Sequence, residues 1–332
     1  MLEHGGRLLA AAARHGIAAE DWLDLSTGIA PYSYPVPPIS SGVWQRLPED
    51  EDGLPAIACR CYGAQRALPL PGSQSGIQAL PRLKAPGVAM VLAPSYGEYA
   101  AAWRAAGHVV RSVAADDLVS AVGEADAVIL GNPNNPTGRR FPRRILLDLA
   151  RQLEIRGGWL IVDEAFADAQ DHSESLADVA GSAAAGNVVV LRSLGKFFGL
   201  AGARVGFAIA NESILALLAE AIGPWAVAHP SRMAARAALA DREWQGAQRA
   251  RLQQDGARLH RLLATAGLGE SSGTALFRYL VRDDARELHE YFARQGILLR
   301  HFEKPAAVRC GLPATESQWQ RLAATLDQWK TR

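Results

Sequence analysis

The stretch from Ser193 to Gly206 reads SLGKFFGLAGARVG and decides how the rest of the chain can be interpreted. It places Lys196 between glycine-rich turns, after one apolar run and before another. A lysine shielded from water holds its proton less firmly, so its amine becomes available for nucleophilic chemistry near neutral pH. A lone lysine is more often a solvated surface residue. Here Ser193 and Arg204 flank it, and both can bind a phosphate group, which favours a functional site.

Three more motifs with polar or glycine-rich ends precede this stretch. The segment 72–76, GSQSG, leads into a helical pattern, so its backbone amides could bind phosphate at a helix N-terminus. The segment 132–138, NPNNPTG, follows an apolar run, and the segment 159–166, WLIVDEAF, carries Asp163 at the end of another. Taken alone, each has a commoner explanation as a turn or a helix cap. The complete heptapeptide 132–138 directly after a predicted strand is a far more specific signal of a functional loop than its content of Asn, Pro and Gly.

The fold class follows from short apolar runs that alternate with amphipathic helical stretches. Such alternation predicts an α/β fold, with a mostly parallel sheet covered by helices. The runs lie at residues 88–92, 109–113, 127–130, 159–162, 188–191 and 205–209.

Three regions are expected along the chain. Residues 1–40 are predicted to form an N-terminal arm, because the stretch from Pro31 to Pro38 cannot hold regular helix. Residues 41–228 are predicted to form the large domain, and residues 229–332 a linking helix and a small α/β domain. The proline-free stretch 231–266 is expected to be one long helix. In the small domain we expect strands at 276–281, 297–299 and 307–310, and helices at 285–295 and 316–329.

Composition favours small-molecule chemistry. The 332 residues are 49% hydrophobic and carry a formal net charge of +1, so neither nucleic acid nor an anionic membrane is an expected partner. Cys59, Cys61 and Cys310 form neither a disulfide framework nor a paired zinc-ligand pattern, so no metal is expected. The N-terminal residues lack the basic start and apolar run of a secretory signal, which predicts a cytoplasmic protein.

The Ser-x-x-Lys spacing with a downstream arginine resembles that of fold-type I pyridoxal-phosphate (PLP) enzymes, the aspartate-aminotransferase-like transferases. The resemblance implies a large domain with a mostly parallel sheet, a small α/β domain, and PLP as cofactor. It implies that Lys196 binds PLP covalently. Asp163 would pair with the protonated pyridine nitrogen and keep the ring an electron sink, and Asn135 would bond the phenolic oxygen.

Further contacts are implied by the same resemblance. The cofactor phosphate would be bound by Ser73, Gln74, Ser193 and Arg204. Tyr96 matches the aromatic residue that stacks on the cofactor ring. Phe166 stands at a cofactor-contact position where most transaminases have a tyrosine. Arg309 matches the arginine that binds the substrate carboxylate, a task for which a bidentate guanidinium is suited.

Within this family, the chain is similar to the L-threonine-O-3-phosphate decarboxylases of cobalamin biosynthesis. The similarity lies in His4-Gly5-Gly6, in the segment 24–31, DLSTGIAP, and in the DEAF sequence ending at Phe166. It implies decarboxylation of L-threonine O-3-phosphate to (R)-1-amino-2-propanol O-2-phosphate. His4, Gly5 and Gly6 would then bind the substrate phosphate, and Asn135 would also contact the substrate.

Several alternatives remain open from the sequence. An aminotransferase acting on histidinol phosphate or a similar phosphorylated amine shares the fold, although Leu47 stands where that group has a tyrosine reaching the neighbouring subunit. A ligand-sensing regulator would carry a DNA-binding module before this fold. A nicotinamide dehydrogenase is disfavoured because no G-x-G-x-x-G follows a strand. A homodimer is expected, since family members build each active site at a subunit boundary.

Overall fold

The computed structural model describes residues 4–170 and 173–331. Backbone contacts divide the chain into two compact units. The large unit comprises Ser33–Asn135 and Arg139–Gly246, and the small unit comprises Met1–Tyr32, Pro136–Gly138 and Ala247–Arg332. The N-terminal residues up to Tyr32 are thus part of the C-terminal unit, although the sequence separates them by more than half the chain.

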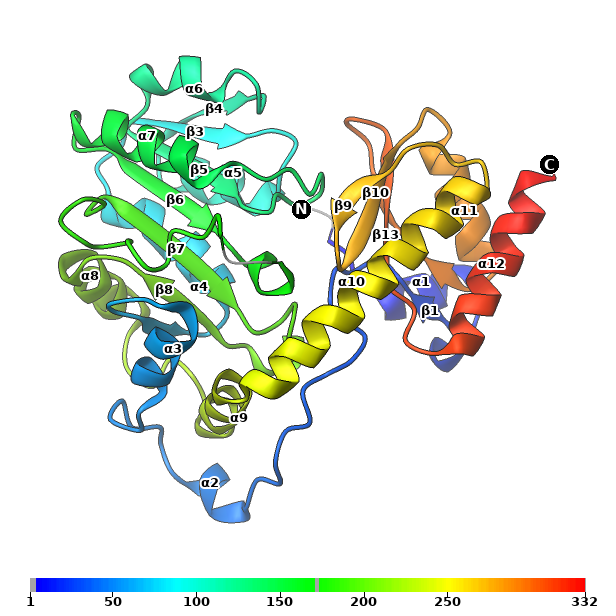
Figure 1. The fold of residues 1–332 in the computed structure, drawn as a ribbon, viewed down its shortest axis with the longest axis horizontal. Coiled ribbons are helices and arrows are strands. Elements are labelled where there is room, and N and C mark those ends of the chain that lie inside the picture. Colours follow the sequence, from blue (N-terminus) through cyan, green and yellow to red (C-terminus); the bar gives the residue numbers. More distant parts are fainter. Residues whose placement is uncertain (1–3, 171–172, 332) are drawn as a thin grey trace. The chain divides into compact units, whose positions relative to one another are not determined.

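The large unit is built on a seven-stranded sheet (Figure 1). Its strands in spatial order are β2 (Leu68–Leu70), β8 (Gly206–Ile209), β7 (Val188–Ser193), β6 (Trp159–Asp163), β5 (Ala127–Gly131), β3 (Val88–Leu92) and β4 (Val109–Val113). The five strands from β7 to β4 run parallel, whereas β8 and β2 are antiparallel to their neighbours. The prediction of a mostly parallel sheet with these six longer strands is confirmed, and the short strand β2 was not predicted.

Helices cover the sheet because its central strands are apolar on both faces. Every residue of β5 and β7 is buried. Side chains from α4 (Ser73–Ala79), α5 (Gly97–Ala105) and α8 (Glu212–Ile222) form one core cluster with the sheet. The helix α7 (Arg143–Glu154) contacts β6 and buries apolar side chains at helical spacing. The other helices of this unit are α2 (Ser41–Gln45), α3 (Leu54–Tyr62), α6 (Leu118–Ala121) and α9 (His229–Ala240).

The predicted single helix over 231–266 is wrong. The structure has two helices, α9 and α10 (Arg242–Thr265), separated at Asp241. Asp241 has non-helical backbone angles, φ −86 and ψ 84, and its carboxylate accepts a hydrogen bond of 2.9 Å from the Trp244 amide. A side chain that satisfies a free amide in this way begins a new helix, a signal that helix propensity alone does not carry.

The small unit contains a four-stranded antiparallel sheet. Its spatial order is β12 (Arg300–Phe302), β13 (Ala307–Gly311), β10 (Phe277–Val281) and β9 (Ser272–Thr274). The helices α11 (Ala285–Arg294) and α12 (Glu316–Lys330) and the strands β10 and β13 agree with the prediction. β11 (Ile297–Leu298) also lies where a strand was predicted, and it pairs in parallel with β1 (Leu23–Asp24), which was not predicted.

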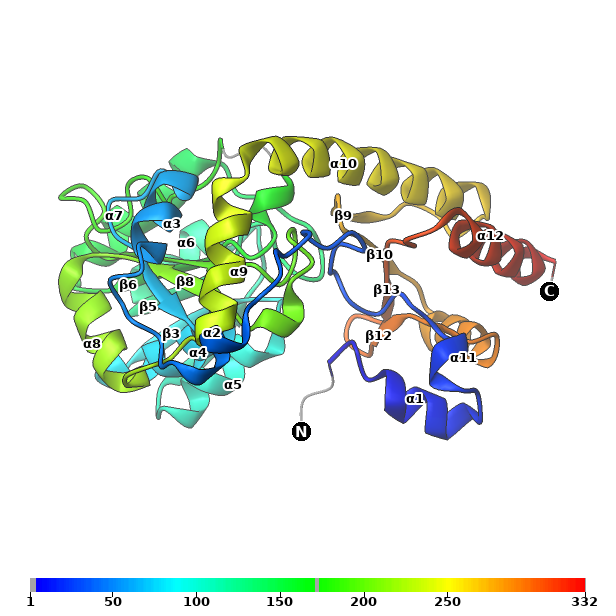
Figure 2. The same cartoon turned by 90° about the horizontal axis from the view of Figure 1, so that it is seen from below.

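The first helix, α1 (Leu8–His15), packs beside α11 within this unit (Figure 2). Apolar side chains of α1 contact a cluster that includes Trp22 and Ala293, and Arg14 forms an ion pair of 2.8 Å with Glu290. Short 3-10 turns occur at Ala19–Asp21, Leu80–Leu83, Val122–Glu124, Ala167–Ala169 and Ala201–Ala203. Across the described residues, no helix combines the length and the apolar character that crossing a bilayer requires.

Candidate functional site

Three parallel strands of the large unit end at one edge of the sheet, and each carries predicted site residues just beyond or at its end. Gly131 of β5 pairs with Asp163 of β6, and Asp163 pairs in turn with Leu191 of β7. Because carboxyl ends of parallel strands meet at the same edge, the loops that follow are brought together. Three of the predicted motifs, those containing Asn135, Asp163 and Lys196, therefore start from neighbouring points.

Asp163 is a buried carboxylate held in a defined orientation. The Tyr99 hydroxyl donates a hydrogen bond of 2.7 Å to one of its oxygens, and the Ala165 amide donates one of 2.9 Å to the other. Burial raises the pKa of Asp163, while the hydrogen bonds and the positive charge of Lys196 act in the opposite direction. A cation placed against this carboxylate would stabilise its ionised form. A protonated ring nitrogen fits that requirement.

Lys196 lies close to the same carboxylate and against an aromatic face. Its Nζ is 5.6 Å from the centroid of the Phe166 ring, within the range of a cation–π contact. Phe166 is itself buried, so the amine has an apolar wall on this side. The structure therefore brings together Lys196, Asp163 and Phe166, as the sequence motifs predict.

A cationic and hydrogen-bonding cradle lies at the start of α4. Gly72 precedes this helix with φ 76, and a Cβ atom there would stand 2.8 Å from the guanidinium of Arg204. A Cβ on Gly206 would stand 2.4 Å from the amide nitrogen of Ser73, and Gly206 pairs with Ser193 across the sheet. The guanidinium, a helix start and two hydroxyls thus converge. This arrangement fits a phosphate group.

Tyr96 and Gln74 connect this cradle with Asp163. The Tyr96 hydroxyl donates a 3.0 Å hydrogen bond to the Gln74 side chain, and the Tyr96 ring makes an edge contact at 5.5 Å with Tyr99. Burial, followed by the nearby carboxylates Glu98 and Asp163, raises the pKa of Tyr96 to about 12. The ring is therefore neutral and fixed between the helix start and Asp163, as an aromatic stacking partner must be.

The loop 132–138 uses two of its three asparagines to hold its own shape. Asn132 exchanges hydrogen bonds with the backbone of Phe141, and the Asn134 side chain donates to the Pro94 carbonyl at 3.0 Å. The third, Asn135, is half-buried at the end of this part of the large unit. Its assignment to the cofactor and the substrate stays a prediction.

In the small unit, Arg309 lies buried on β13. Its Nη2 donates a 2.8 Å hydrogen bond to the Ser26 carbonyl, and its guanidinium carbon is 5.0 Å from the centroid of the Phe277 ring. Arg300 of β12 pairs directly with it, so the two arginines share one face of the sheet. Burial and then Arg300 lower the pKa of Arg309 to about 10, against the opposite effect of Asp24. This positive environment suits an anionic ligand.

The glycines of the N-terminal segment pack against the same part of the small unit. The Gly6 amide donates a 2.7 Å hydrogen bond to the Ser26 hydroxyl, and a Cβ on Gly5 would stand 2.4 Å from the Ser26 carbonyl oxygen. Ser26 is the residue whose carbonyl also accepts from Arg309. His4 is exposed and precedes these glycines, and its role stays a prediction.

Two residues of these sites were missed from the sequence. Tyr99 follows Tyr96 at helical spacing, so a helix prediction for α5 would have placed both on one side. Arg300 was missed because the expected strand ended at Leu299, whereas the structure begins β12 at Arg300. The available signal was that Arg300 and Arg309 lie in two consecutive strands, where neighbouring side chains can share one face.

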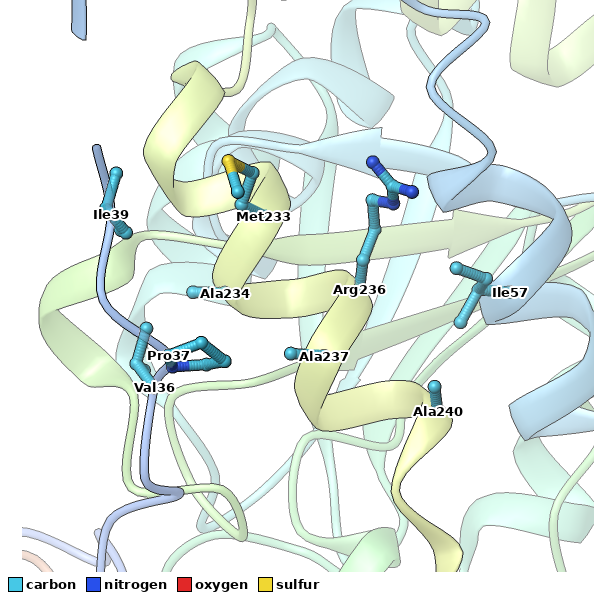
Figure 3. A pocket seen from close by; sticks show the side chains of 9 residues that line it. All are labelled: Val36, Pro37, Ile39, Ile57, Met233, Ala234, Arg236, Ala237 and Ala240. Atoms are coloured by element: carbon cyan, nitrogen blue, oxygen red, sulfur yellow. The ribbon is translucent and has the colours of Figure 1, made fainter. Parts of the chain in front are cut away.

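A separate hollow of about 370 Å³ lies in the large unit, between the segment at Val36 and the helix α9 (Figure 3). Its walls are mainly apolar, with Arg236 as the charged member of the nine lining residues. None of the candidate cofactor residues lines it. Within the part of the chain that the structure describes, no group of three or more metal-ligating side chains is found.

Comparison with known proteins agrees with this geometry. The family model described as Aminotransferase class I and II matches residues 60–328. The chain belongs to this family. It is 51% identical to a threonine-phosphate decarboxylase of Pseudomonas aeruginosa over 98% of this chain and 97% of that protein, and 42% identical to one of Sinorhizobium sp over 97% of each. The resemblance inferred from the motifs is thereby confirmed.

The fold is shared with solved structures of much lower identity. The crystal structure of histidinol-phosphate aminotransferase from Sinorhizobium meliloti in complex with pyridoxal-5'-phosphate superposes with a TM-score of 0.85 at 21% identity. It covers 99% of this chain and 95% of that chain. The predicted aspartate-aminotransferase-like fold is therefore confirmed.

Proposed function

We propose that this PLP-dependent enzyme decarboxylates L-threonine O-3-phosphate to (R)-1-amino-2-propanol O-2-phosphate, the linker in the nucleotide loop of cobalamin. The observation that carries the substrate assignment is the pair Arg309 and Arg300, which share one face of the small-unit sheet. Two guanidinium groups suit a substrate with two anionic groups, a carboxylate and a phosphate. The two decarboxylase relatives, which match nearly the whole chain, support the same conclusion.

The large unit provides the residues that would hold PLP. Lys196 would bind its aldehyde carbon, Asp163 its ring nitrogen and Asn135 its phenolic oxygen. The phosphate would lie against Ser73, Gln74, Ser193 and Arg204, with Tyr96 and Phe166 beside the ring. When bound, PLP supplies an electron sink for the electron pair left on the α-carbon as carbon dioxide departs.

Asp163 is held by hydrogen bonds that favour its ionised form, against the effect of its burial. The Tyr99 hydroxyl and the Ala165 amide both donate to the carboxylate, and each bond favours its charged form. Tyr99 can only donate at neutral pH, because burial raises its own pKa well above the usual value. A cationic partner placed against Asp163 would add to these bonds in favouring its negative charge.

Arg309 and the N-terminal segment would bind and orient the substrate. The guanidinium of Arg309 would bind the carboxylate, while Arg300, His4 and the amide of Gly5 would bind the phosphate. The Gly6 amide donates to the Ser26 hydroxyl and would hold this segment in place. Fixing both anionic groups decides which bond at the α-carbon is aligned for cleavage. We assign to the Lys196 amine the proton that returns to the same carbon.

We also propose that the enzyme is a homodimer that acts in the cytoplasm. Trp44 and Leu47 are 67% and 60% exposed on the segment around α2, and exposed apolar side chains that lie close in sequence are typical of protein interfaces. All three cysteines are thiols, which fits a reducing compartment. Besides a second copy of the chain, the expected partner is the small-molecule phosphorylated substrate.

The decisive experiment measures the products from purified holoenzyme. Threonine phosphate, histidinol phosphate and threonine are offered separately, with and without an oxo-acid acceptor. The proposal predicts stoichiometric carbon dioxide from threonine phosphate without any acceptor. Transfer of the amine that depends on the acceptor, without carbon dioxide, would instead identify an aminotransferase.

A further inference from the structure

We infer that Ser26 is a positioning residue that connects the N-terminal Gly5-Gly6 segment to Arg309. Ser26 is buried, with 2% of its surface exposed, and it belongs to the short segment that follows β1. Its role in substrate selection rests on the proposed function, because that function assigns the substrate phosphate to the segment and the carboxylate to Arg309.

Each polar atom of Ser26 is engaged in a specific hydrogen bond. Its hydroxyl donates to Asp24 Oδ1 at 2.6 Å, and its amide donates to the same oxygen at 2.9 Å. The hydroxyl oxygen accepts from the Gly6 amide at 2.7 Å, and the carbonyl oxygen accepts from Arg309 Nη2 at 2.8 Å. One residue therefore bonds both to Arg309, which the proposed function assigns to the substrate carboxylate, and to the Gly5-Gly6 segment, which it assigns to the phosphate.

Asp24 determines which way the Ser26 hydroxyl points. A hydroxyl has one proton, and the nearby carboxylate accepts it. The lone pairs of the oxygen are then directed to other donors, of which the Gly6 amide is one. Donation to an ionised acceptor also polarises the hydroxyl and strengthens the bond it accepts. Asp24 thus acts on Gly6 through Ser26.

Close packing fixes the Ser26 carbonyl between the segment and the arginine. A Cβ on Gly5 would stand 2.4 Å from this oxygen, and contacts that short do not occur, so glycine is required there while the segment is docked. From the other side, Gly311 of β13 donates to the Leu25 carbonyl at 2.7 Å, and a Cβ on Gly311 would stand 2.5 Å from the Thr27 carbonyl. The segment 25–27 is therefore held against β13, the strand that carries Arg309.

The consequence is a fixed separation between Arg309 and the amide of Gly5. Small changes in the position of a binding group reduce binding and turnover of a substrate that needs both groups at once. Unphosphorylated threonine needs only Arg309 of the two. Loosening the connection at Ser26 should therefore reduce the preference for threonine phosphate over threonine.

The test uses Ser26→Ala, which removes the hydroxyl but keeps the carbonyl that Arg309 binds. The matched control is Thr325→Val, which removes another buried small-unit hydroxyl, one that donates to the Arg321 carbonyl in α12. Gly5→Ala is the second variant, because it displaces the segment without removing a hydrogen-bonding group from the core. All are assayed as holoenzyme, with threonine phosphate and threonine as substrates.

For Ser26→Ala and Gly5→Ala we expect the kcat/KM ratio of threonine phosphate over threonine to fall about five- to tenfold, the effect of one lost hydrogen bond. The fall should appear in KM for threonine phosphate, with kcat within about twofold. Combining the two changes should cost little more than either, since both break one connection. Thr325→Val should leave the ratio unchanged. Equal ratios in Ser26→Ala and the control would overturn the inference.

Hydrogen exchange separates this inference from the proposed function. The Gly6 amide is protected in the docked segment, so exchange in the peptide spanning residues 4–8 should be faster in Ser26→Ala than in wild type or Thr325→Val. This measurement needs no turnover. If wild type released no carbon dioxide, the proposed function would fail. The exchange data would still test whether Ser26 holds the Gly5-Gly6 segment. Unchanged exchange in Ser26→Ala would overturn it whatever the activity.

Discussion

Two buried arginines, one in each unit, have opposite surroundings. Arg192 of β7 lies 2.9 Å from Glu164 and 3.0 Å from Asp168, and its guanidinium stands 4.7 Å from the centroid of the Tyr62 ring. Arg309 of β13 instead donates to a neutral backbone carbonyl and has a second arginine opposite it in register. Both are almost fully buried, at 1% and 6% exposure, so burial does not distinguish them.

Their pKa shifts have opposite signs. Burial alone would lower the pKa of Arg192, but Glu164 and Asp168 outweigh it and the pKa is raised. Burial and then Arg300 lower the pKa of Arg309 to about 10. The first guanidinium is compensated by the fold itself, whereas the second lies where an added anion would be strongly stabilised. The neighbours of a buried charge, more than its burial, therefore separate a structural role from a binding role.

The compensated cluster is formed by residues next in sequence to the candidate site residues. Glu164 follows Asp163 directly after β6, and Arg192 precedes Ser193 within β7, where successive side chains point to opposite faces of the sheet. Glu164 further accepts from the Ser175 hydroxyl and the Leu176 amide, at 2.7 Å and 2.9 Å. Neighbouring residues in one motif can therefore have different tasks, the first in the site and the next in holding the strand end in place.

The largest effect on activity is expected from Arg309→Met. It removes up to two charge-assisted hydrogen bonds to the substrate carboxylate, each worth about 1.5–3 kcal/mol, so kcat/KM should fall by about a thousandfold. The free energy of unfolding should fall less than in Arg192→Met, because Arg309 donates to the neutral Ser26 carbonyl, whereas Arg192 pairs with two buried carboxylates. Carbon dioxide release and urea unfolding of the same preparation check both parts. Strong destabilisation with little loss of activity would reverse the assigned roles.

Arg192→Met should give the opposite result. Glu164 and Asp168 would remain buried without their cation, which costs about 3–5 kcal/mol of unfolding free energy. The activity per folded molecule should fall far less than in Arg309→Met. Urea unfolding of the holoenzyme measures the loss, and titration of bound cofactor gives the folded fraction. A variant as stable as wild type would contradict the structural role.

Arg300→Gln tests the second arginine beside Arg309. If it binds the substrate phosphate, the kcat/KM ratio of threonine phosphate over threonine should fall about tenfold, as expected for one charge-assisted bond. The control is Arg286→Gln, which removes a cation from the small unit where the side chain is 74% exposed. The same fall in both variants would indicate a general effect of net charge on an anionic substrate.

Much of this fold could be predicted because the relevant signals are local. The central strands are continuous apolar runs, and the residues at their ends are polar, so both the sheet and the edge that carries Asp163 follow from the sequence. Boundaries that depend on single side chains were less accessible. Asp241 divides one expected helix into two, and β1 exists only because it pairs with β11, far along the chain.

The sites were predictable where residue type and motif spacing agree. The structure places Lys196 beside Phe166 and near Asp163, and Arg204 beside Gly72 at the start of α4, while their roles stay predictions. Tyr99 and Ser26 were not singled out, because their roles depend on contacts with residues distant in sequence. The opposite roles of Arg192 and Arg309 were likewise inaccessible, since both are arginines in apolar strands.

Asp163 extends the comparison to a negative charge, with a pH dependence as the expected result. Burial raises its pKa in the folded protein, so just above the usual carboxyl value of 3.8 the folded state binds more protons than the unfolded state. Stability contributed by Asp163 is then present at low pH and is lost as pH rises through the raised pKa. In cofactor-free protein, the stability of wild type relative to Asp163→Asn should therefore decrease as pH rises. Urea unfolding of both proteins across this pH range measures the difference in unfolding free energy. A difference that increases with pH would contradict a net raised pKa of Asp163 in the folded protein.

The smallest effects are expected from two tyrosine hydroxyls, one near each arginine. Among the described residues, the hydroxyls of Tyr62 and Tyr279 are buried and have no hydrogen-bond partner. Tyr62 presents its ring to Arg192, and Tyr279 lies opposite Arg309 in register, with its pKa raised by burial to about 12. Replacing either by phenylalanine removes a desolvated group and keeps the ring, so the unfolding free energy should stay the same or rise by up to about 1 kcal/mol.

Only Tyr279 faces the region expected to bind an anion, and its hydroxyl can donate a hydrogen bond to that anion. Tyr279→Phe should therefore raise KM for threonine phosphate about fivefold, while Tyr62→Phe leaves it unchanged. Steady-state kinetics and urea unfolding of both variants give the comparison, and an unchanged KM in both would count against an anion site beside Arg309.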